Sequence, residues 1–218
     1  MFERLGRPQT VLEPGCGSGR MLEAFMRRGV DVAGIDASPK MIELARERLG
    51  KGADLRVADM TDLDLGRTFD GAISPINTLL HLTPEQLARH LACMATELGV
   101  GGIYLVQVGL LTPETYDPSA AAHIEASRGD TALGMDWEDV DVDFARGVSR
   151  QRSRIEVLAG DRAGEVIEEL HEMTLWTPTT WHAAIDVSPF AETATYDGGR
   201  TGEWPLVGRD ATGGLLWH

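Results

Sequence analysis

The chain has 218 residues, with 34 acidic and 20 basic side chains and a formal charge of −14. This acidity argues against sequence-independent binding to nucleic acid or to an anionic membrane, because both need a basic surface. No apolar run reaches the roughly 20 residues that span a bilayer, and residues 1–10 lack the apolar segment of a secretory signal. We therefore expect a cytoplasmic protein in which Cys16 and Cys93 are free thiols.

Short apolar runs alternate with amphipathic stretches between residues 10 and 109, which is typical of βα units around a parallel sheet. Three helices are predicted between the strands: one after the glycine-rich turn 15–19, one from Ser38-Pro39, and one from the capping box that begins at Thr83. The predicted strands are 10–13, 32–35, 55–57, 69–74 and 103–106.

The pattern changes after this region. Residues 111–129 contain no clear element, whereas residues 131–175 alternate in part, which predicts antiparallel strands with one solvated face. A capped helix is predicted from Thr177-Pro178, and two final strands are predicted near 191–196 and 213–217.

The strongest local signal is the run VLEPGCGSGR at residues 11–20. A glycine-rich turn between a strand and a helix lets the backbone approach a ligand closely. A dinucleotide-binding fingerprint would need a glycine where Arg20 stands; here Gly15, Gly17 and Gly19 follow Glu13 instead. The alternative is a tight turn that binds nothing.

Two aspartates follow the next two predicted strands. Asp36 lies about 20 residues beyond the glycine turn, where doubly wound folds place an acid that accepts ribose hydroxyls. An Asp before Ser-Pro is also a common capping residue, but its position after the glycine turn favours the ligand role. Asp59-Met60 is a weaker signal, and its alternative is a loop aspartate beside a core methionine.

Taken in order, several runs resemble the successive motifs of class I S-adenosylmethionine-dependent methyltransferases: VLEPGCGSGR, VAGIDASPKMIELAR, VADMTDL, FDGAISPINTLLHLTPEQLARHL and LGVGGIYLV. The resemblance covers residues 10–109, about half of the chain. It implies an α/β fold with a doubly wound, mostly parallel, Rossmann-like sheet of seven strands. We expect a single domain over residues 1–218, with an antiparallel cap inserted at about 130–176.

The resemblance also implies where S-adenosylmethionine would bind. Glu13 and the glycine turn would surround its methionine part, Asp36 would bind the ribose hydroxyls, and Asp59 would accept a hydrogen bond from the adenine amino group. The cofactor-binding residues expected in this way are Glu13, Gly15, Gly17, Gly19, Asp36, Ala37, Met41, Asp59, Met60 and Ser74. No His/Cys cluster has ligand spacing, so no metal site is expected.

Methyl transfer is an in-line displacement in which positioning supplies much of the catalysis. Ser74 would lie next to the transferred methyl group, and His81 is the best-placed candidate base if the nucleophile arrives protonated. The alternative for His81 is a packing or capping role. His123 and His171 are weaker candidates.

The run SPINTLLHLTPEQL and the insertion before LWTPTTW are similar to small-molecule methyltransferases that include amino-sugar N-methyltransferases, in which the insertion roofs the acceptor pocket. We expect methyl transfer to a small molecule, with an amine nitrogen first and a hydroxyl or carboxyl oxygen as the alternative. Trp176 and Trp181 are expected in the core, with a wall of the acceptor pocket as the alternative. The acidic stretch 136–143 is expected on a solvated strand face; lining the pocket, it would instead select a cationic acceptor.

The sequence departs from the family pattern in two places. Only about ten residues precede the first motif, where such enzymes usually have a few dozen, so either the start lies upstream or another segment closes the site. The Asn/Asp-Pro-Pro-aromatic signature of nucleobase methyltransferases is absent at Ser74-Pro75-Ile76-Asn77, which argues against a DNA or RNA substrate. Two other functions stay open: an NAD(P)-dependent oxidoreductase and a non-catalytic S-adenosylmethionine-binding protein. The oligomeric state is not indicated.

Overall fold

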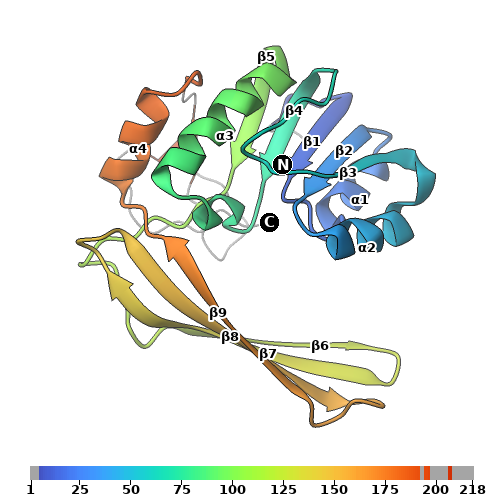
Figure 1. Cartoon of the computed structure of the whole chain (residues 1–218), viewed down its shortest axis with the longest axis vertical. Helices are drawn as coiled ribbons and strands as arrows, with labels where there is room; N and C mark the ends of the chain where they lie inside the picture. The colour runs from blue at the N-terminus through green and yellow to red at the C-terminus, as the bar shows by residue number, and fades with distance from the viewer. Residues whose placement is uncertain (1–4, 192–193, 197–205, 208–218) are drawn as a thin grey trace.

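The structure is a computed structural model that describes residues 5–191, 194–196 and 206–207 (Figure 1). Its larger sheet is parallel and has the strand order β3-β2-β1-β4-β5. These strands are β1 (Thr10–Pro14), β2 (Asp31–Asp36), β3 (Ala53–Val57), β4 (Phe69–Ser74) and β5 (Leu98–Val106). The order reverses direction between β1 and β4, which is the switch point beside which doubly wound folds bind ligands.

Helices cover both faces of this sheet. Successive side chains of a strand point to opposite faces, so Val11 packs with Leu22 and Ile42 on one side, while Leu12 packs with Met94 on the other. Because the inner strands of the sheet are buried on both faces, they read as nearly continuous apolar runs. The helices are α1 (Arg20–Met26), α2 (Pro39–Leu49) and α3 (Pro84–Glu97), with short 3₁₀ helices η1 (Gly50–Gly52) and η2 (Thr78–His81).

The predicted caps explain where these helices begin. Thr83 Oγ1 accepts from the Gln86 N–H, and Gln86 Oε1 accepts from the Thr83 N–H, at 3.3 and 2.9 Å. Ser38 caps α2 by accepting from the Met41 N–H. These local bonds satisfy amides that have no partner inside a helix.

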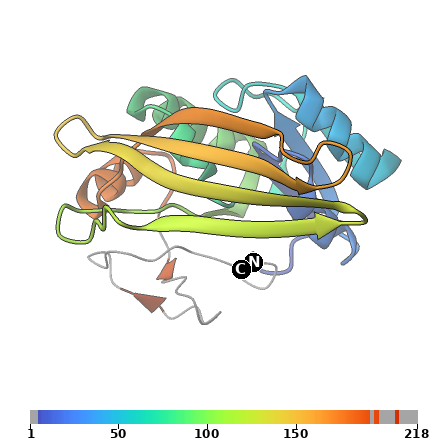
Figure 2. The same cartoon turned by 90° about the horizontal axis from the view of Figure 1, so that it is seen from below.

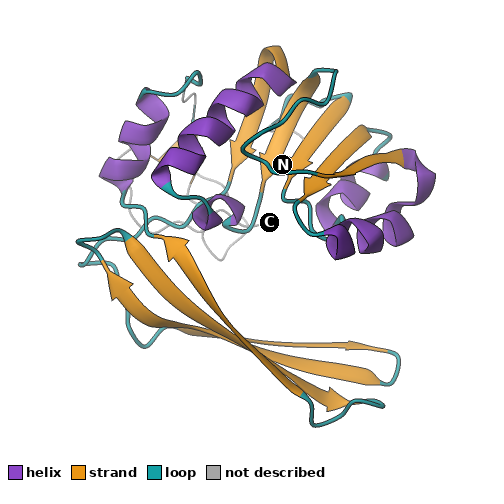
Figure 3. Cartoon of the chain, in the orientation of Figure 1, coloured by secondary structure: helices purple, strands orange, loops and turns teal. Residues whose placement is uncertain are grey.

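The second sheet is antiparallel, with the order β6-β7-β8-β9. It consists of β6 (Ala121–Arg128), β7 (Thr131–Asp143), β8 (Val148–Ala159) and β9 (Val166–Thr174), and α4 (Pro178–Asp186) follows it. The arrowheads of the parallel strands point toward this sheet, which forms a separate layer beyond their carboxyl ends (Figure 3). Seen from that side, its four strands lie across the molecule (Figure 2).

The structure confirms the α/β architecture with an added antiparallel sheet and corrects details of it. The parallel sheet has five strands in the described residues rather than seven, because β10 (Thr195–Tyr196) pairs antiparallel with β11 (Leu206–Val207) instead of joining it. The strand expected at 213–217 lies outside the described residues. The antiparallel sheet begins with β6, inside the stretch 111–129 that showed no clear element; every residue of β6 is exposed, so no apolar alternation marks it.

Within the described residues, no helix combines the length and apolarity that crossing a bilayer would require.

Candidate cofactor and acceptor site

The glycine turn between β1 and α1 has left-handed backbone at all three predicted glycines, with φ of +70°, +52° and +76° at Gly15, Gly17 and Gly19. A Cβ on Gly15 would lie 2.6 Å from Thr78 Cγ2, and one on Gly19 would lie 2.8 Å from Leu49 Cδ1. These two glycines are therefore required by packing. A Cβ on Gly17 would meet nothing within 4 Å, so this part of the turn faces open space.

Glu13 is the last residue but one of β1, and only 3% of its surface is exposed. The Leu22 backbone donates to its carboxyl group, yet Oε2 has no hydrogen-bond partner. Burial, and then the nearby charge of Asp36, raise the pKa of Glu13 well above its ordinary value. A buried carboxylate oxygen without a donor is unfavourable, so this position suits a ligand that brings a positively charged donor.

Asp36 joins the glycine turn to the start of α2. Its Oδ2 accepts from the Gly17 N–H at 2.9 Å, and its Oδ1 accepts from the Ser38 N–H at 2.8 Å. Each carboxylate oxygen has a further lone pair with which it can accept a ligand hydroxyl. Cys16 lies in the same turn, but burial, and then the charges of Glu13 and Asp36, raise the pKa of its thiol to about 12. The thiol is therefore protonated and unreactive near neutral pH.

The neighbouring loops bring further predicted residues to the same edge. Ala37 follows β2 and is exposed, and Met41 in the first turn of α2 is 41% exposed. Asp59 follows β3; its Oδ1 accepts from both the N–H and the hydroxyl of Thr61, each at 2.8 Å. These two bonds lower the pKa of Asp59, so this exposed carboxylate is ionised near neutral pH.

Ser74 ends β4, but its side chain is fully buried. Its Oγ lies 2.6 Å from the Tyr104 hydroxyl, which lies 2.7 Å from His90 Nε2. His90 Nδ1 then lies 2.8 Å from the Met60 carbonyl oxygen. Ser74, Tyr104, His90 and Met60 are called the buried relay below. The Ser74 hydroxyl is thus engaged in the core, and the relay connects the ends of β3 and β4. Sequence reasoning missed His90 and Tyr104.

His81, the candidate base, meets the antiparallel sheet. Its ring lies edge-to-face with that of His171 on β9, with centroids 6.4 Å apart. The Trp137 ring stacks on that of His171 with centroids 5.0 Å apart, and Ser153 Oγ lies 3.0 Å from His171 Nε2. Partial burial, and then His171, lower the pKa of His81, which keeps its imidazole neutral. The structure therefore brings together two of the three candidate histidines, one from each layer.

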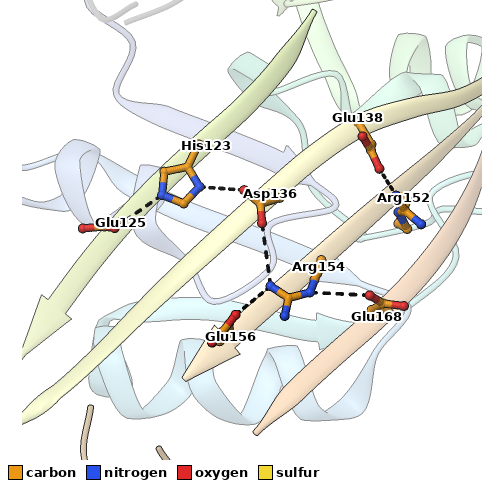
Figure 4. A network of polar contacts seen from close by, with 8 residues as sticks. All are labelled: His123, Glu125, Asp136, Glu138, Arg152, Arg154, Glu156 and Glu168. Carbon is orange, nitrogen blue, oxygen red and sulfur yellow. Dashed lines mark hydrogen bonds and ion pairs between the residues drawn. The ribbon is translucent and has the colours of Figure 1, made fainter. Parts of the chain in front are cut away.

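His123 lies elsewhere, on the charged face of the antiparallel sheet (Figure 4). Its Nδ1 lies 2.6 Å from Asp136 Oδ1, and Asp136 also contacts Arg154 at 3.8 Å. Glu138 on the same strand pairs with Arg152. Since these acids pair with exposed cations of neighbouring strands, the prediction of a solvated face is confirmed for Asp136 and Glu138.

The two tryptophans belong to the core. Trp176 and Trp181 are 5% and 7% exposed, and their rings pack edge-to-face at 5.7 Å. Among the side chains that the structure describes, no three of His, Cys, Asp or Glu lie close enough together to hold a metal ion.

Comparisons with known proteins agree with this geometry. Residues 11–102 match a family described as "Methyltransferase domain". A curated relative, the dTDP-3-amino-3,4,6-trideoxy-alpha-D-glucopyranose N,N-dimethyltransferase of Streptomyces venezuelae, is 28% identical over 209 residues, which are 94% of this chain and 84% of that protein. A magnesium-protoporphyrin O-methyltransferase of Rhodobacter capsulatus is 36% identical over 94 residues, which are 41% of this chain and 39% of that protein.

Among solved structures, DesVI of Streptomyces venezuelae superposes with a TM-score of 0.79 at 26% identity, covering 93% of this chain and 84% of that one. The similarity extends over the parallel sheet and through the antiparallel sheet. Residues 11–102 thus match a methyltransferase domain, and the fold that contains them is shared with DesVI.

Proposed function

We propose that this chain transfers methyl groups from S-adenosylmethionine to the amine nitrogen of a nucleotide-linked deoxyamino sugar. One observation carries the choice of acceptor. The alignment with the amino-sugar N,N-dimethyltransferase covers 94% of the chain and so includes the antiparallel sheet, whereas the alignment with the porphyrin O-methyltransferase covers 41%. That the alignment extends over the antiparallel sheet supports an amino-sugar acceptor.

The residues at the carboxyl edge fit the proposed cofactor. Glu13 Oε2 is a buried acceptor without a donor, which suits the α-ammonium group of the methionine part. The two oxygens of Asp36 keep lone pairs for the ribose hydroxyls. Open space at Gly17 leaves room for the ligand to approach the backbone. Acceptors rather than cations dominate this edge, as a ligand with an ammonium, a sulfonium and hydroxyls requires.

The two adenine-side loops complete this proposed site. Met41 is partly exposed and would pack against the adenine face, with Ala37 lining the ribose side. The ionised Asp59 would accept from the adenine amino group, beside the Met60 backbone that the buried relay holds. We propose that Gly15 and Gly19 act indirectly, since their Cβ positions are filled by protein atoms.

The bound cofactor supplies an electrophilic methyl group on a sulfonium, whose sulfur leaves as a neutral thioether. The chain has to place the acceptor amine in line with the carbon–sulfur bond and to exclude water. We propose that His81 faces the amine, since it lies between the β4 end and His171 of the antiparallel sheet. Its neutral imidazole can accept a proton that the amine carries on arrival or loses after transfer.

The test is a methylation assay on purified full-length chain with S-adenosylmethionine and synthetic dTDP-linked 3-amino and 4-amino deoxysugars. Mass spectrometry should show products with one and two added methyl groups. A hydroxyl analogue in which oxygen replaces the amine tests O-methylation in parallel. Binding of S-adenosylhomocysteine without turnover of any amine or hydroxyl acceptor would favour a non-catalytic binding protein instead. If the chain does not bind S-adenosylhomocysteine, the proposed cofactor itself is wrong.

A further inference from the structure

A strained turn connects β4 to η2. Ile76 and Asn77 have φ of +55° and +59°, and Arg7 is the one other non-glycine residue with positive φ in the described part of the chain. Left-handed backbone is unfavourable for side chains other than glycine, above all for a β-branched one such as isoleucine. Strain of this kind persists where the surroundings hold it, and it is concentrated at functional sites.

Two amide side chains hold the turn. Gln107 Oε1 accepts from the Ile76 N–H at 2.9 Å, and Asn77 Oδ1 accepts from the Gly109 N–H at 2.7 Å. Because a backbone N–H can only donate, the Gln107 amide must present its oxygen to Ile76. Its Nε2 has no hydrogen-bond partner, although Gln107 is only 3% exposed. This orientation of the Gln107 amide therefore satisfies the Ile76 N–H but leaves the Gln107 NH₂ group without an acceptor.

The turn also contacts the glycine turn of the cofactor edge. Thr78 Oγ1 donates to the Pro75 carbonyl at 2.6 Å, which leaves the Thr78 methyl group in the space that a Gly15 Cβ would need. The turn after β4 therefore contacts the glycine turn through Thr78. It is also hydrogen-bonded to Gln107 and Gly109, which follow β5 and precede the antiparallel sheet. Between these anchors, the Ile76 side chain remains 53% exposed.

We propose that the strained turn holds the Ile76 side chain as an apolar wall of the acceptor site, with Gln107 as its positioning residue. The proposal rests on the proposed function. Ile76 follows β4 in the sequence, and the carboxyl ends of the parallel strands face the antiparallel sheet (Figure 3). An apolar wall there suits an acceptor with a deoxygenated carbon beside its amine, and it keeps water from the nucleophile.

The experiment compares Ile76→Ala, Ile76→Gly and Ile76→Val by thermal denaturation, titration with S-adenosylhomocysteine and steady-state methylation. Left-handed backbone predicts that the Gly variant melts about 2–4 °C above the Ala variant; at an ordinary φ the order would be reversed. Both should lose about 10- to 100-fold in kcat/KM for the acceptor with an unchanged Kd for S-adenosylhomocysteine. Ile76→Val should retain most of the activity because it keeps a β-branched wall.

Two further variants make the test specific. Gln107→Met removes the acceptor of the Ile76 N–H and should reproduce the loss in kcat/KM, whereas Gln107→Glu keeps an oxygen there and should restore much of it. Arg7→Gly relieves positive φ before β1, at the opposite edge of the sheet, and should leave kcat/KM unchanged. A loss in that control would mean that a backbone change far from the site lowers kcat/KM as well, and would overturn the proposal.

Other results also overturn it, and they can be told apart from a failure of the proposed function. If the wild-type chain methylates the amino sugar and the Ala and Gly variants keep its full kcat/KM, the Ile76 side chain does not line the acceptor site. If the Ala variant melts above the Gly variant, the turn is not left-handed in solution. If wild type neither binds S-adenosylhomocysteine nor methylates any acceptor, the proposed function itself fails, and the wall fails with it.

Discussion

Replacement of Glu13 by Gln separates what the fold requires from what the cofactor requires. Burial raises the pKa of this carboxyl group above its ordinary value of 4.5, so the folded chain holds the proton more tightly than the unfolded chain. The stability of the ligand-free protein should therefore fall as the pH rises from about 4.5 through the raised pKa. Glutamine cannot ionise, so Glu13→Gln should lack this loss.

The magnitudes follow from the unpartnered Oε2. A buried acceptor atom left without a donor costs about 1–3 kcal/mol, and more when the group is charged. Since the amide of glutamine stays partly unsatisfied, we expect Glu13→Gln to gain about 1–2 kcal/mol, or about 2–8 °C in Tm. A lost charge-assisted bond to the ligand ammonium group costs about 1.5–3 kcal/mol, which weakens the Kd for S-adenosylhomocysteine by about 10- to 150-fold.

The assays are differential scanning fluorimetry across the pH range and isothermal titration calorimetry with S-adenosylhomocysteine. Glu97→Gln is the matched control, because Glu97 is also buried, also has an unpartnered Oε2, and also has a raised pKa. It ends α3 before the amino end of β5, away from the candidate site, so its replacement should leave the Kd unchanged. An unchanged Kd in Glu13→Gln, or an equal change in both variants, would refute the reasoning.

Three further replacements test other parts of the site. Asp36→Ala removes the carboxylate that accepts from the Gly17 and Ser38 N–H groups. It should weaken S-adenosylhomocysteine binding at least ~10-fold, measured by calorimetry. His81→Asn should abolish the acidic limb of the pH–rate profile. Burial and His171 lower the pKa of His81, so in wild type that limb should lie below pH 6.5, where the imidazole becomes protonated. Tyr104→Phe removes the central hydroxyl of the buried relay and should reduce the free energy of unfolding by about 1–3 kcal/mol, measured by urea denaturation.

Each of these has a result that contradicts it. Wild-type affinity in Asp36→Ala would mean that the ribose hydroxyls bind elsewhere. Binding of NAD to the wild-type chain would instead favour an NAD(P)-dependent oxidoreductase. An acidic limb that survives in His81→Asn would assign the titration to another group. Tyr104→Phe with undiminished stability would mean that water replaces its hydroxyl.

Local signals explain why much of the fold was predictable. The glycine turn, the Ser38 cap and the Thr83 capping box each act within a few residues, and each begins a helix where the sequence predicts one. The inner strands β1, β2 and β4 are buried on both faces, so they stand out as apolar runs. By contrast, β6 has no buried face and β5 begins at Leu98 rather than at 103, since an irregular register opposite β4 lets it run through Gly101-Gly102.

The parts of the candidate site that depend on distant residues were not predictable in the same way. The relay joins Met60 to His90 and Tyr104 through core contacts, and a single histidine on an apolar helix face carries no sequence signal. The contact between His81 and His171 depends on how the antiparallel sheet folds back, which periodicity within either segment does not reveal. The positive φ of Ile76 is also hidden from the sequence, because the turn is held by hydrogen bonds to Gln107 and Gly109, which follow β5.

The buried relay has a fixed polarity. A carbonyl oxygen can only accept, so the bond to Met60 requires the proton on Nδ1 of His90. Burial lowers the pKa of His90 and keeps the ring neutral, which leaves Nε2 as a bare lone pair. The Tyr104 hydrogen must then point to His90 and the Ser74 hydrogen to Tyr104. Every hydrogen of the relay thus points from Ser74, at the end of β4, toward Met60, which follows β3. The ¹⁵N chemical shifts of the His90 imidazole alone would therefore report the direction of all the hydrogen bonds in the relay.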